Sequence, residues 1–152
     1  MRRAKSALIV FLLAAVILVA APVSSGTANA ATSKELRRKL FSLTNSARRS
    51  NHMRPLMLNW RLSRSAVAHA RRMANRHSVY HSANLYKLVR PFHPTSWGEN
   101  VGMAGSVRRI HRLYMRSPAH RSNILRNAFS RVGIGVVQRG SRVWTTVIFY
   151  GG

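Results

Sequence analysis

Few side chains in this 152-residue sequence could carry out acid–base or nucleophilic chemistry. It has seven histidines, two glutamates (Glu35 and Glu99), no aspartate and no cysteine. The absence of cysteine excludes a thiol nucleophile and a cysteine-bound zinc finger. The absence of aspartate and of a G-x-S-x-G segment argues against a Ser-His-Asp triad. Glu99 and some of the histidines are therefore the candidates for catalysis or metal binding.

Three polar segments hold these candidates. His81 begins H-S-A-N, Glu99 lies within W-G-E-N-V, and His120 belongs to S-P-A-H-R-S-N-I-L, which begins at Ser117. Two imidazoles and a carboxylate can bind one divalent metal ion such as zinc and leave a fourth position to water. The alternative is a buried polar network in which Glu99 holds the two rings by hydrogen bonds. The residue types alone leave both interpretations open.

The other histidines have simpler interpretations. His77 precedes His81 by four residues, which is a metal-ligand spacing if a helix continues that far. His69 is predicted to be partly buried on a helix. Three more are predicted to be surface or loop residues: His52, His93 and His111.

The first half of the chain predicts two helices. Thr32 and Glu35 form a capping box, which starts a helix over about 33–50 and gives Glu35 a structural role. A second helix is expected over 60–77, because apolar residues recur there at helical spacing. Its arginines are interpreted as a solvated face. Residues 78–105 contain several prolines and glycines and are expected to be irregular.

The second half predicts helices followed by a hairpin. Ser106 can cap a third helix, and a short helical turn is expected over 118–126. Strands over 132–137 and 143–150 flank a turn signal at residues 139–141. Gly133 and Gly135 would leave one strand face bare, which suggests close approach of a neighbouring element. The order indicates an α+β fold. Five aromatic residues are expected in the core: Trp97, Trp144, Phe92, Phe129 and Phe149.

Residues 1–30 have the pattern of a secretory signal peptide. Basic residues precede an apolar run over 7–21, and Ala28-Asn29-Ala30 predicts cleavage after Ala30, leaving a single domain over 31–152. The apolar run is shorter than the roughly 20 residues of a membrane span, so no transmembrane segment is expected in the mature chain.

The charge of the chain is extreme, at +24. Loss of Arg2, Arg3 and Lys5 with the leader would leave +21. Such a protein is attracted to polyanions, which outside a cell include anionic envelope polymers and acidic lipids. Specific nucleic-acid binding is not expected, because no stacking or groove-reading motif is present and the chain is predicted to be secreted.

The motifs together resemble the CAP superfamily of cysteine-rich secretory, antigen 5 and pathogenesis-related proteins (SCP domains), and its bacterial branch in particular. The resemblance covers about residues 36–150 and rests on blocks in a fixed order. These are Asn45 with Arg48, His81, Gly98-Glu99-Asn100, Ser117 through Leu125, Val132 through Val136, and a last strand with Trp144 and Phe149.

The resemblance implies an α-β-α sandwich with a small antiparallel sheet between helices. It also implies a cavity with two histidines and two acids, of which His81, Glu99 and His120 would be three. Ser117 stands at the position of the second acid, so the set of metal ligands is incomplete.

Two functions follow as hypotheses. The first is a secreted, envelope-associated protein that acts by binding. The second is a peptidase-like hydrolase, with or without a metal ion, in which Glu99 is a general base or metal ligand and a histidine activates water or Ser117. The ligand and the oligomeric state are not predicted.

Overall fold

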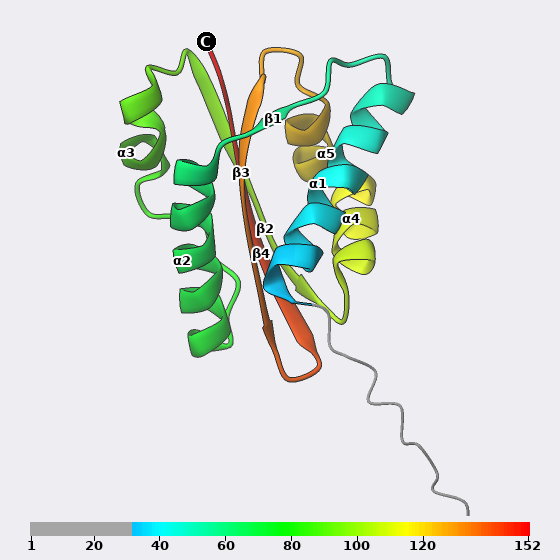
Figure 1. Ribbon diagram of the computed structural model, residues 1–152, viewed down its shortest axis with the longest axis vertical. Helices are drawn as coiled ribbons and strands as arrows, with labels where there is room; N and C mark the ends of the chain where they lie inside the picture. The colour runs from blue at the N-terminus through cyan, green and yellow to red at the C-terminus, as the bar shows by residue number, and fades with distance from the viewer. Residues whose placement is uncertain (1–31) are drawn as a thin grey trace, which may run out of the picture.

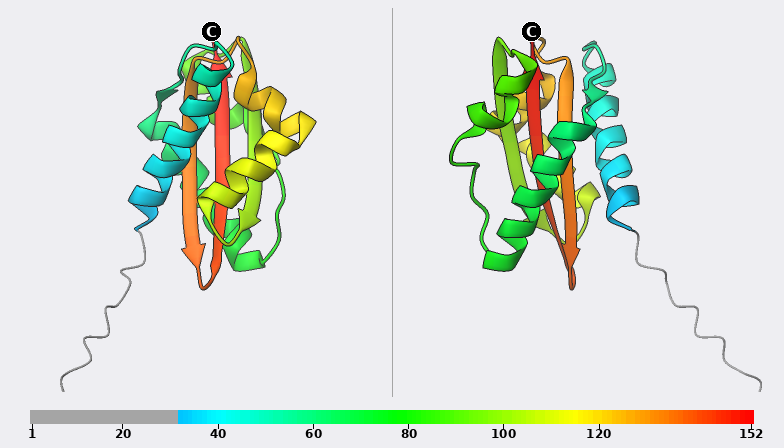
Figure 2. Two further views of the ribbon diagram at one scale, coloured as in Figure 1. Left: turned by 90° about the vertical axis from the view of Figure 1, so that its right-hand side faces the viewer. Right: turned by 60° about the vertical axis from the view of Figure 1, so that its left-hand side comes forward.

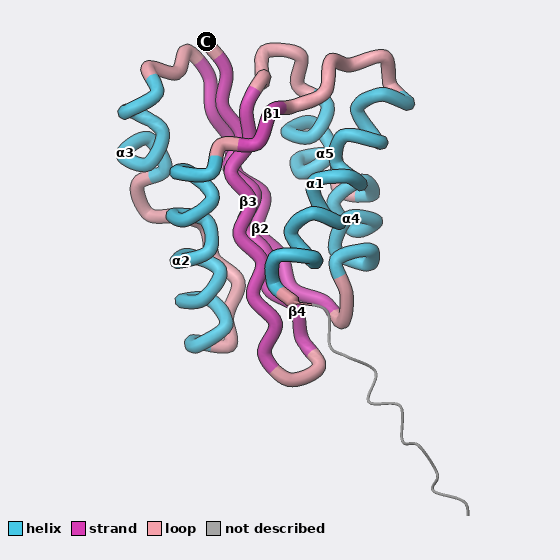
Figure 3. Tube along the Cα trace, viewed as in Figure 1, coloured by secondary structure: helices cyan, strands magenta, loops and turns pink. Residues whose placement is uncertain are grey.

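The computed structural model describes residues 32–152. A four-stranded sheet stands between two layers of helices (Figures 1 and 3). The helices are α1 (Ser33–Ser50), α2 (Trp60–Arg76), α3 (Leu85–Val89), the 3-10 turn η1 (Arg90–Phe92), α4 (Val107–Arg116) and α5 (Pro118–Leu125). The turned views place α2 and α3 on one face of the sheet and α1, α4 and α5 on the other (Figure 2). The predicted α-β-α sandwich is confirmed, and the predicted signal peptide lies outside the described residues.

The sheet has the order β1-β3-β4-β2. Its strands are β1 (Met57–Leu58), β2 (Ser96–Ala104), β3 (Arg131–Arg139) and β4 (Arg142–Gly151). β2 and β3 both pair antiparallel with β4, whereas the short β1 pairs parallel with β3. The hairpin turn holds Gly140 at a φ of 57°, a conformation that suits glycine. β2 is an edge strand, and it carries Glu99.

Capping side chains fix where the helices begin. The Glu35 carboxylate accepts from the Thr32 backbone N–H at 2.7 Å, and the Thr32 hydroxyl accepts from the Glu35 N–H at 3.3 Å. These bonds lower the pKa of Glu35 and leave it in a capping role. Ser106 caps α4 in the same way, through the N–H of Arg109 at 3.2 Å. The predicted helix starts are therefore confirmed.

The expectation that residues 78–105 are irregular was wrong. The segment contains α3, η1 and the nine-residue strand β2. Only Trp97 and Val101 in β2 favour a strand by type, and two of its residues are glycine. β2 is stabilised as a strand by its hydrogen bonds with β4, which extend along its whole length, and not by the strand propensity of its own residues. Long-range pairing of this kind cannot be seen in a local pattern.

Gly133 and Gly135 allow α2 to lie directly on β3. A Cβ at Gly135 would overlap the backbone of Ala66, and one at Gly133 would overlap Leu62. Both partners belong to α2 and are buried. The predicted close approach of another element at these two glycines is confirmed, with α2 as that element.

A fully buried arginine connects α1 to the far end of the chain. The Arg48 guanidinium donates to the carbonyls of Arg54 at 2.7 Å, Ile124 at 2.9 Å, Arg126 at 3.0 Å and Phe129 at 3.0 Å. These carbonyls satisfy a cation that has no carboxylate partner, and burial lowers its pKa from the ordinary value. The side chain therefore fixes α1, the loop before β1 and the segment between α5 and β3 in one arrangement.

Asn45 makes a second connection from α1. Its side-chain amide donates to the Leu56 carbonyl at 3.0 Å, and its oxygen accepts from the Leu56 N–H at 2.8 Å. These two hydrogen bonds fix the backbone of Leu56, directly before β1, to α1.

Most aromatic and aliphatic residues are buried as expected, but Trp97 is not. Its side chain is 41% exposed and lies against Tyr86 of α3, which is 47% exposed, with ring centroids 4.9 Å apart. Trp97 lies near the start of the edge strand, where only the short α3 covers it. Across residues 32–152, no helix has the length and apolar character needed to cross a membrane.

Candidate functional site

The Glu99 carboxylate is the centre of a small polar cluster on β2. Its Oε2 accepts from His81 Nδ1 at 2.9 Å and from the Ser82 N–H at 2.9 Å, and its Oε1 accepts from the Ser82 hydroxyl at 2.7 Å. The Glu99 side chain is 2% exposed, whereas that of His81 is 62% exposed. A buried carboxylate with three donors is well satisfied. The sequence predicted that Glu99 holds the rings of both His81 and His120. The structure shows the bond to His81 and adds Ser82, whereas His120 Nδ1 bonds Ser117 instead.

His69 positions the segment that carries His81 and Ser82. It is buried on α2, and its Nε2 donates to the Tyr80 carbonyl at 2.8 Å. A carbonyl only accepts, so Nε2 carries the proton and Nδ1 accepts from Arg72 at 3.3 Å. The rings of His69 and Tyr80 also meet edge to face at 5.1 Å. His69 was predicted to be partly buried and is fully buried, and its position on the helix gave no sign that it holds this loop.

His120 approaches the edge strand from the other side. Its Nδ1 forms a hydrogen bond with the Ser117 hydroxyl at 3.0 Å, and its carbonyl accepts from Asn100 at 2.9 Å. Asn123 donates to the Asn100 side-chain oxygen at 2.9 Å. Desolvation and the nearby charge of His81 lower the pKa of His120. Ser117 begins α5 but makes no capping bond to its backbone, so its hydroxyl serves His120 instead.

The alternation of β2 explains this arrangement. Glu99 pairs with Ile148, which packs among the residues under α2, and Asn100 pairs with Val147, which packs under α1 and α4. Neighbouring residues of a strand point to opposite faces. Glu99 therefore meets the loop after α2, and Asn100 meets α5. The two histidines approach the same edge strand from two sides.

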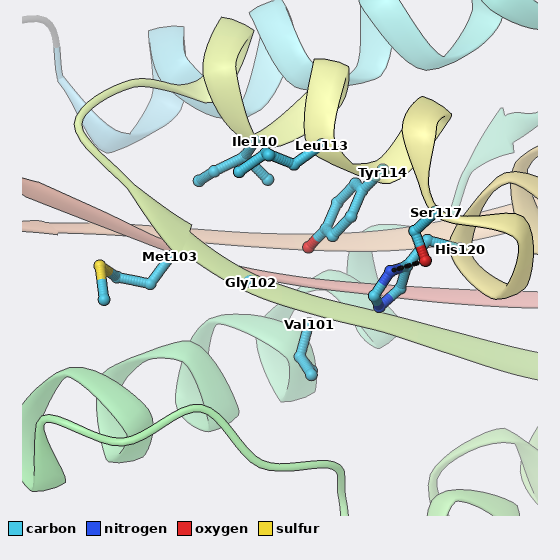
Figure 4. Close-up of a pocket in the computed structure, with 8 residues that line it drawn as sticks. All are labelled: Val101, Gly102, Met103, Ile110, Leu113, Tyr114, Ser117 and His120. Atoms are coloured by element: carbon cyan, nitrogen blue, oxygen red, sulfur yellow. Dashed lines mark hydrogen bonds between the residues drawn. The ribbon is translucent and has the colours of Figure 1, made fainter.

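An apolar pocket lies beside His120, between β2 and α4 (Figure 4). It has a volume of about 330 Å³. The pocket is lined by Val101, Gly102, Met103, Ile110, Leu113, Tyr114, Ser117 and His120. The Tyr114 hydroxyl is held by Thr145 at 2.8 Å, and burial raises the pKa of Tyr114 far above its ordinary value. The polar side chains of the lining are therefore one imidazole, His120, and two hydroxyls, Ser117 and Tyr114.

The donor set does not fit a metal ion in this arrangement. Among residues 32–152, no group of three or more histidine, cysteine or acidic side chains gathers in a metal-binding geometry. Both Glu99 oxygens accept hydrogen bonds, and the His81 nitrogen nearest to them carries a proton. His120 Nδ1 bonds Ser117 instead of converging on Glu99. The three-ligand set of His81, Glu99 and His120 is therefore not assembled.

The remaining histidines lie apart from this cluster. His77 ends α2 in a left-handed conformation with a φ of 50°, so the helix does not continue to His81. The spacing of four residues therefore does not place His77 and His81 on one face of a helix as a pair of metal ligands. His52 and His93 are exposed, as predicted. His111 is half-buried on α4, and its Nε2 is buried without a hydrogen-bond partner among the described residues. Burial lowers the pKa of His111.

The fold and this site define a class of protein. The model of the cysteine-rich secretory protein family, CAP, matches residues 41–149. The match covers well over half of the chain, so this chain belongs to the CAP family. The resemblance expected from the sequence motifs is confirmed.

Individual relatives agree with this assignment. The protein YkwD of Bacillus subtilis strain 168 is 29% identical over 138 residues, covering 82% of this chain and 53% of YkwD. The chain therefore spans about half the length of this curated relative.

Two solved structures show the same fold. An extracellular protein containing a SCP domain, from Bacillus anthracis, has a TM-score of 0.66 at 20% identity, over 79% of this chain and 43% of that chain. An outer surface protein of Borrelia burgdorferi has a TM-score of 0.72 at 14% identity, over 80% of this chain and 96% of that chain. At these identities the likeness concerns the fold alone.

Proposed function

We propose that this chain is a secreted CAP-domain protein that acts at the cell envelope by binding anionic polymers. Nine exposed arginines on two helices carry the proposal. They are Arg61, Arg64, Arg71, Arg72 and Arg76 on α2, and Arg108, Arg109, Arg112 and Arg116 on α4. These helices cover opposite faces of the sheet (Figure 1), and their exposed arginines therefore place positive charge on both sides of the molecule.

Acidic residues do little to neutralise this charge. Within the described residues, no arginine or lysine nitrogen lies within 4.0 Å of a carboxylate oxygen, and the one basic side chain at that distance is the imidazole of His81, beside Glu99. The carboxylate of Glu35 accepts a hydrogen bond from the Thr32 backbone N–H at the start of α1. A surface with so many uncompensated cations attracts polyanions and repels copies of itself. The description of two structural neighbours as extracellular and outer surface proteins supports a location outside the cell, as does the predicted signal peptide.

The geometry does not favour the hydrolase alternative. A general base needs a lone pair that can take a proton from water or a hydroxyl. Glu99 is buried and already accepts three hydrogen bonds, so it is suited to holding the loop at His81 and Ser82. The Ser117–His120 contact joins residues three apart at the start of one helix, a local arrangement that also fits a structural role.

The test is retention of the mature protein on an immobilised anionic polymer such as poly(glycerol phosphate), with uncharged dextran as the matched matrix. We expect retention at 0.1 M NaCl on the anionic matrix alone. Release is expected by 1 M NaCl, because the screening length falls from about 10 Å to about 3 Å. Retention on dextran, or retention that survives 1 M NaCl, would show that the attachment is not electrostatic.

A further inference from the structure

A second pocket lies between α2 and the segment that follows it, and it differs in character from the apolar pocket. Its volume is about 460 Å³. It is lined by basic and hydrogen-bonding side chains, chiefly His69, Arg72, Arg76, His81, Ser82 and Asn84. Neither of the two acids in the described residues lines it.

We infer that this pocket is a binding site for a phosphate or phosphodiester group. The inference deepens the proposed function and rests on it, because it names the chemical group through which an envelope polymer would be held. Arginine is the side chain best suited to phosphate, since its planar fork donates two parallel hydrogen bonds. Arg72 and Arg76 bring two such forks one helical turn apart on the same face of α2.

The two arginines are held in place but keep unused donors. Arg72 gives one N–H to His69 Nδ1 at 3.3 Å, which orients the guanidinium and leaves its other N–H groups available. The Arg76 guanidinium lies over the Tyr80 ring, 5.5 Å from its centroid. Like charges four residues apart on a helix repel each other, so an anion between them removes an unfavourable interaction.

The opposite wall offers donors from a different direction. His81 hydrogen-bonds Glu99 through Nδ1, and its side chain is 62% exposed, so Nε2 is accessible to a ligand. Nε2 donates to an anion when the ring is an imidazolium, the form that a bound phosphate favours. Asn84 uses its side-chain oxygen to cap α3, which leaves its amide N–H groups as donors. Donors on two walls suit a tetrahedral oxyanion with oxygens on several sides better than a planar carboxylate with two.

The Glu99 carboxylate does not itself line this pocket. It accepts directly from His81 and Ser82, which do line it, and its own side chain is 2% exposed behind them. The bond from His69 to the Tyr80 carbonyl fixes the same wall to α2. The pocket is thus preformed, and a ligand would need little further ordering of the chain.

The experiment compares two double variants of equal charge. R72Q/R76Q removes the two guanidinium groups that line the pocket. R64Q/R71Q removes two exposed arginines of the same helix that do not line it. Each variant is titrated at 0.15 M NaCl with poly(glycerol phosphate) and, separately, with vesicles containing phosphatidylglycerol. R64Q/R71Q measures the general electrostatic loss from removing two exposed arginines. We expect R72Q/R76Q to weaken binding at least tenfold more than R64Q/R71Q does.

The outcomes separate this inference from the proposed function. Selective loss on the polymer identifies a polymer phosphodiester as the ligand, and selective loss on vesicles alone identifies a lipid headgroup. Equal losses in both variants would overturn the pocket while leaving general attraction to polyanions intact. A wild-type protein that binds neither probe would overturn the proposed function as well.

A second measurement needs no variant. Inorganic phosphate is titrated into the wild-type protein while the imidazole and arginine side-chain NMR signals are followed. We expect saturable shifts at His81, Arg72 and Arg76. Shifts that do not saturate, or that are equally large at the arginines of α4, would overturn the inference.

Discussion

The guanidinium of Arg48 donates to the carbonyl of Ile124 at 2.9 Å, across 76 positions of sequence. Ile124 lies in the last turn of α5, and the guanidinium reaches three further carbonyls, of which two, those of Arg126 and Phe129, lie after α5. A buried cation satisfied only by carbonyls depends on having enough donors in the right directions. Lysine has a single side-chain nitrogen, so it cannot donate to carbonyls that lie in the several directions reached by the planar guanidinium.

Replacing Arg48 with lysine is therefore expected to lower the free energy of unfolding by about 3 kcal/mol, because buried carbonyls lose charged donors. Urea denaturation at pH 7 measures the change. Arg49→Lys is the control, since Arg49 is the exposed neighbour on the same helix. Similar midpoints for the two variants would show that the guanidinium is not the connection described above.

Gly135 is expected to tolerate no side chain. A Cβ there overlaps the Ala66 backbone, which cannot move without displacing α2 from the sheet. Gly135→Ala should cost about 3 kcal/mol or prevent folding, because overpacking a rigid core is strongly destabilising. Gly105→Ala is the control, since the nearest atom to its added Cβ is the Ser141 carbonyl oxygen at 3.9 Å. Circular dichroism during thermal unfolding compares the two, and equal midpoints would contradict the packing.

Acid is expected to destabilise the fold through His111 and His120. Desolvation lowers the pKa of both below the ordinary value of 6.5. The unfolded chain therefore binds protons that the folded chain does not, so stability falls as the pH drops through 6.5. Each such proton can contribute a slope of at most about 1.4 kcal/mol per pH unit.

The measurement is urea denaturation between pH 7.5 and pH 5. His111→Gln should flatten the fall in stability, whereas His52→Asn, which alters an exposed histidine, should leave it unchanged. A His111→Gln protein with the wild-type slope would show that His111 does not contribute to the pH dependence.

Zinc is expected not to bind stoichiometrically at the Glu99 cluster. An ion would have to displace His81 and both Ser82 donors from a buried carboxylate, inside a chain of high positive charge. Calorimetric titration of the purified protein with zinc, alongside a His81→Ala/His120→Ala variant, measures this. One ion per wild-type chain that is absent from the variant would restore the three-ligand interpretation.

Local signals in the sequence predicted the helix starts, the hairpin and the Glu99–His81 pair. Capping residues act within one turn, so Thr32 and Ser106 reveal their role without a fold. The strand β2 could not be predicted, because its order comes from pairing with β4, about forty to fifty-five residues later. The loop-holding role of His69 could not be predicted either, because its partner is a backbone carbonyl, that of Tyr80, which any residue type provides.

The metal hypothesis shows a different limit. Residue types at His81, Glu99 and His120 permit coordination, but hydrogen bonds decide which atoms remain available. Ser82, directly after His81, supplies two of the three bonds that occupy Glu99. A serine next to a histidine is common in protein sequences, so this pair alone does not predict that Ser82 donates to Glu99.

The buried arginine also has a chemical consequence. This member of a cysteine-rich family has no cysteine, and Arg48 closes a loop of roughly eighty residues of the kind a disulfide would close. A disulfide needs an oxidant to form and is lost to a reductant. A guanidinium held by carbonyls needs neither, so the closed loop forms on folding in reducing and oxidising surroundings alike.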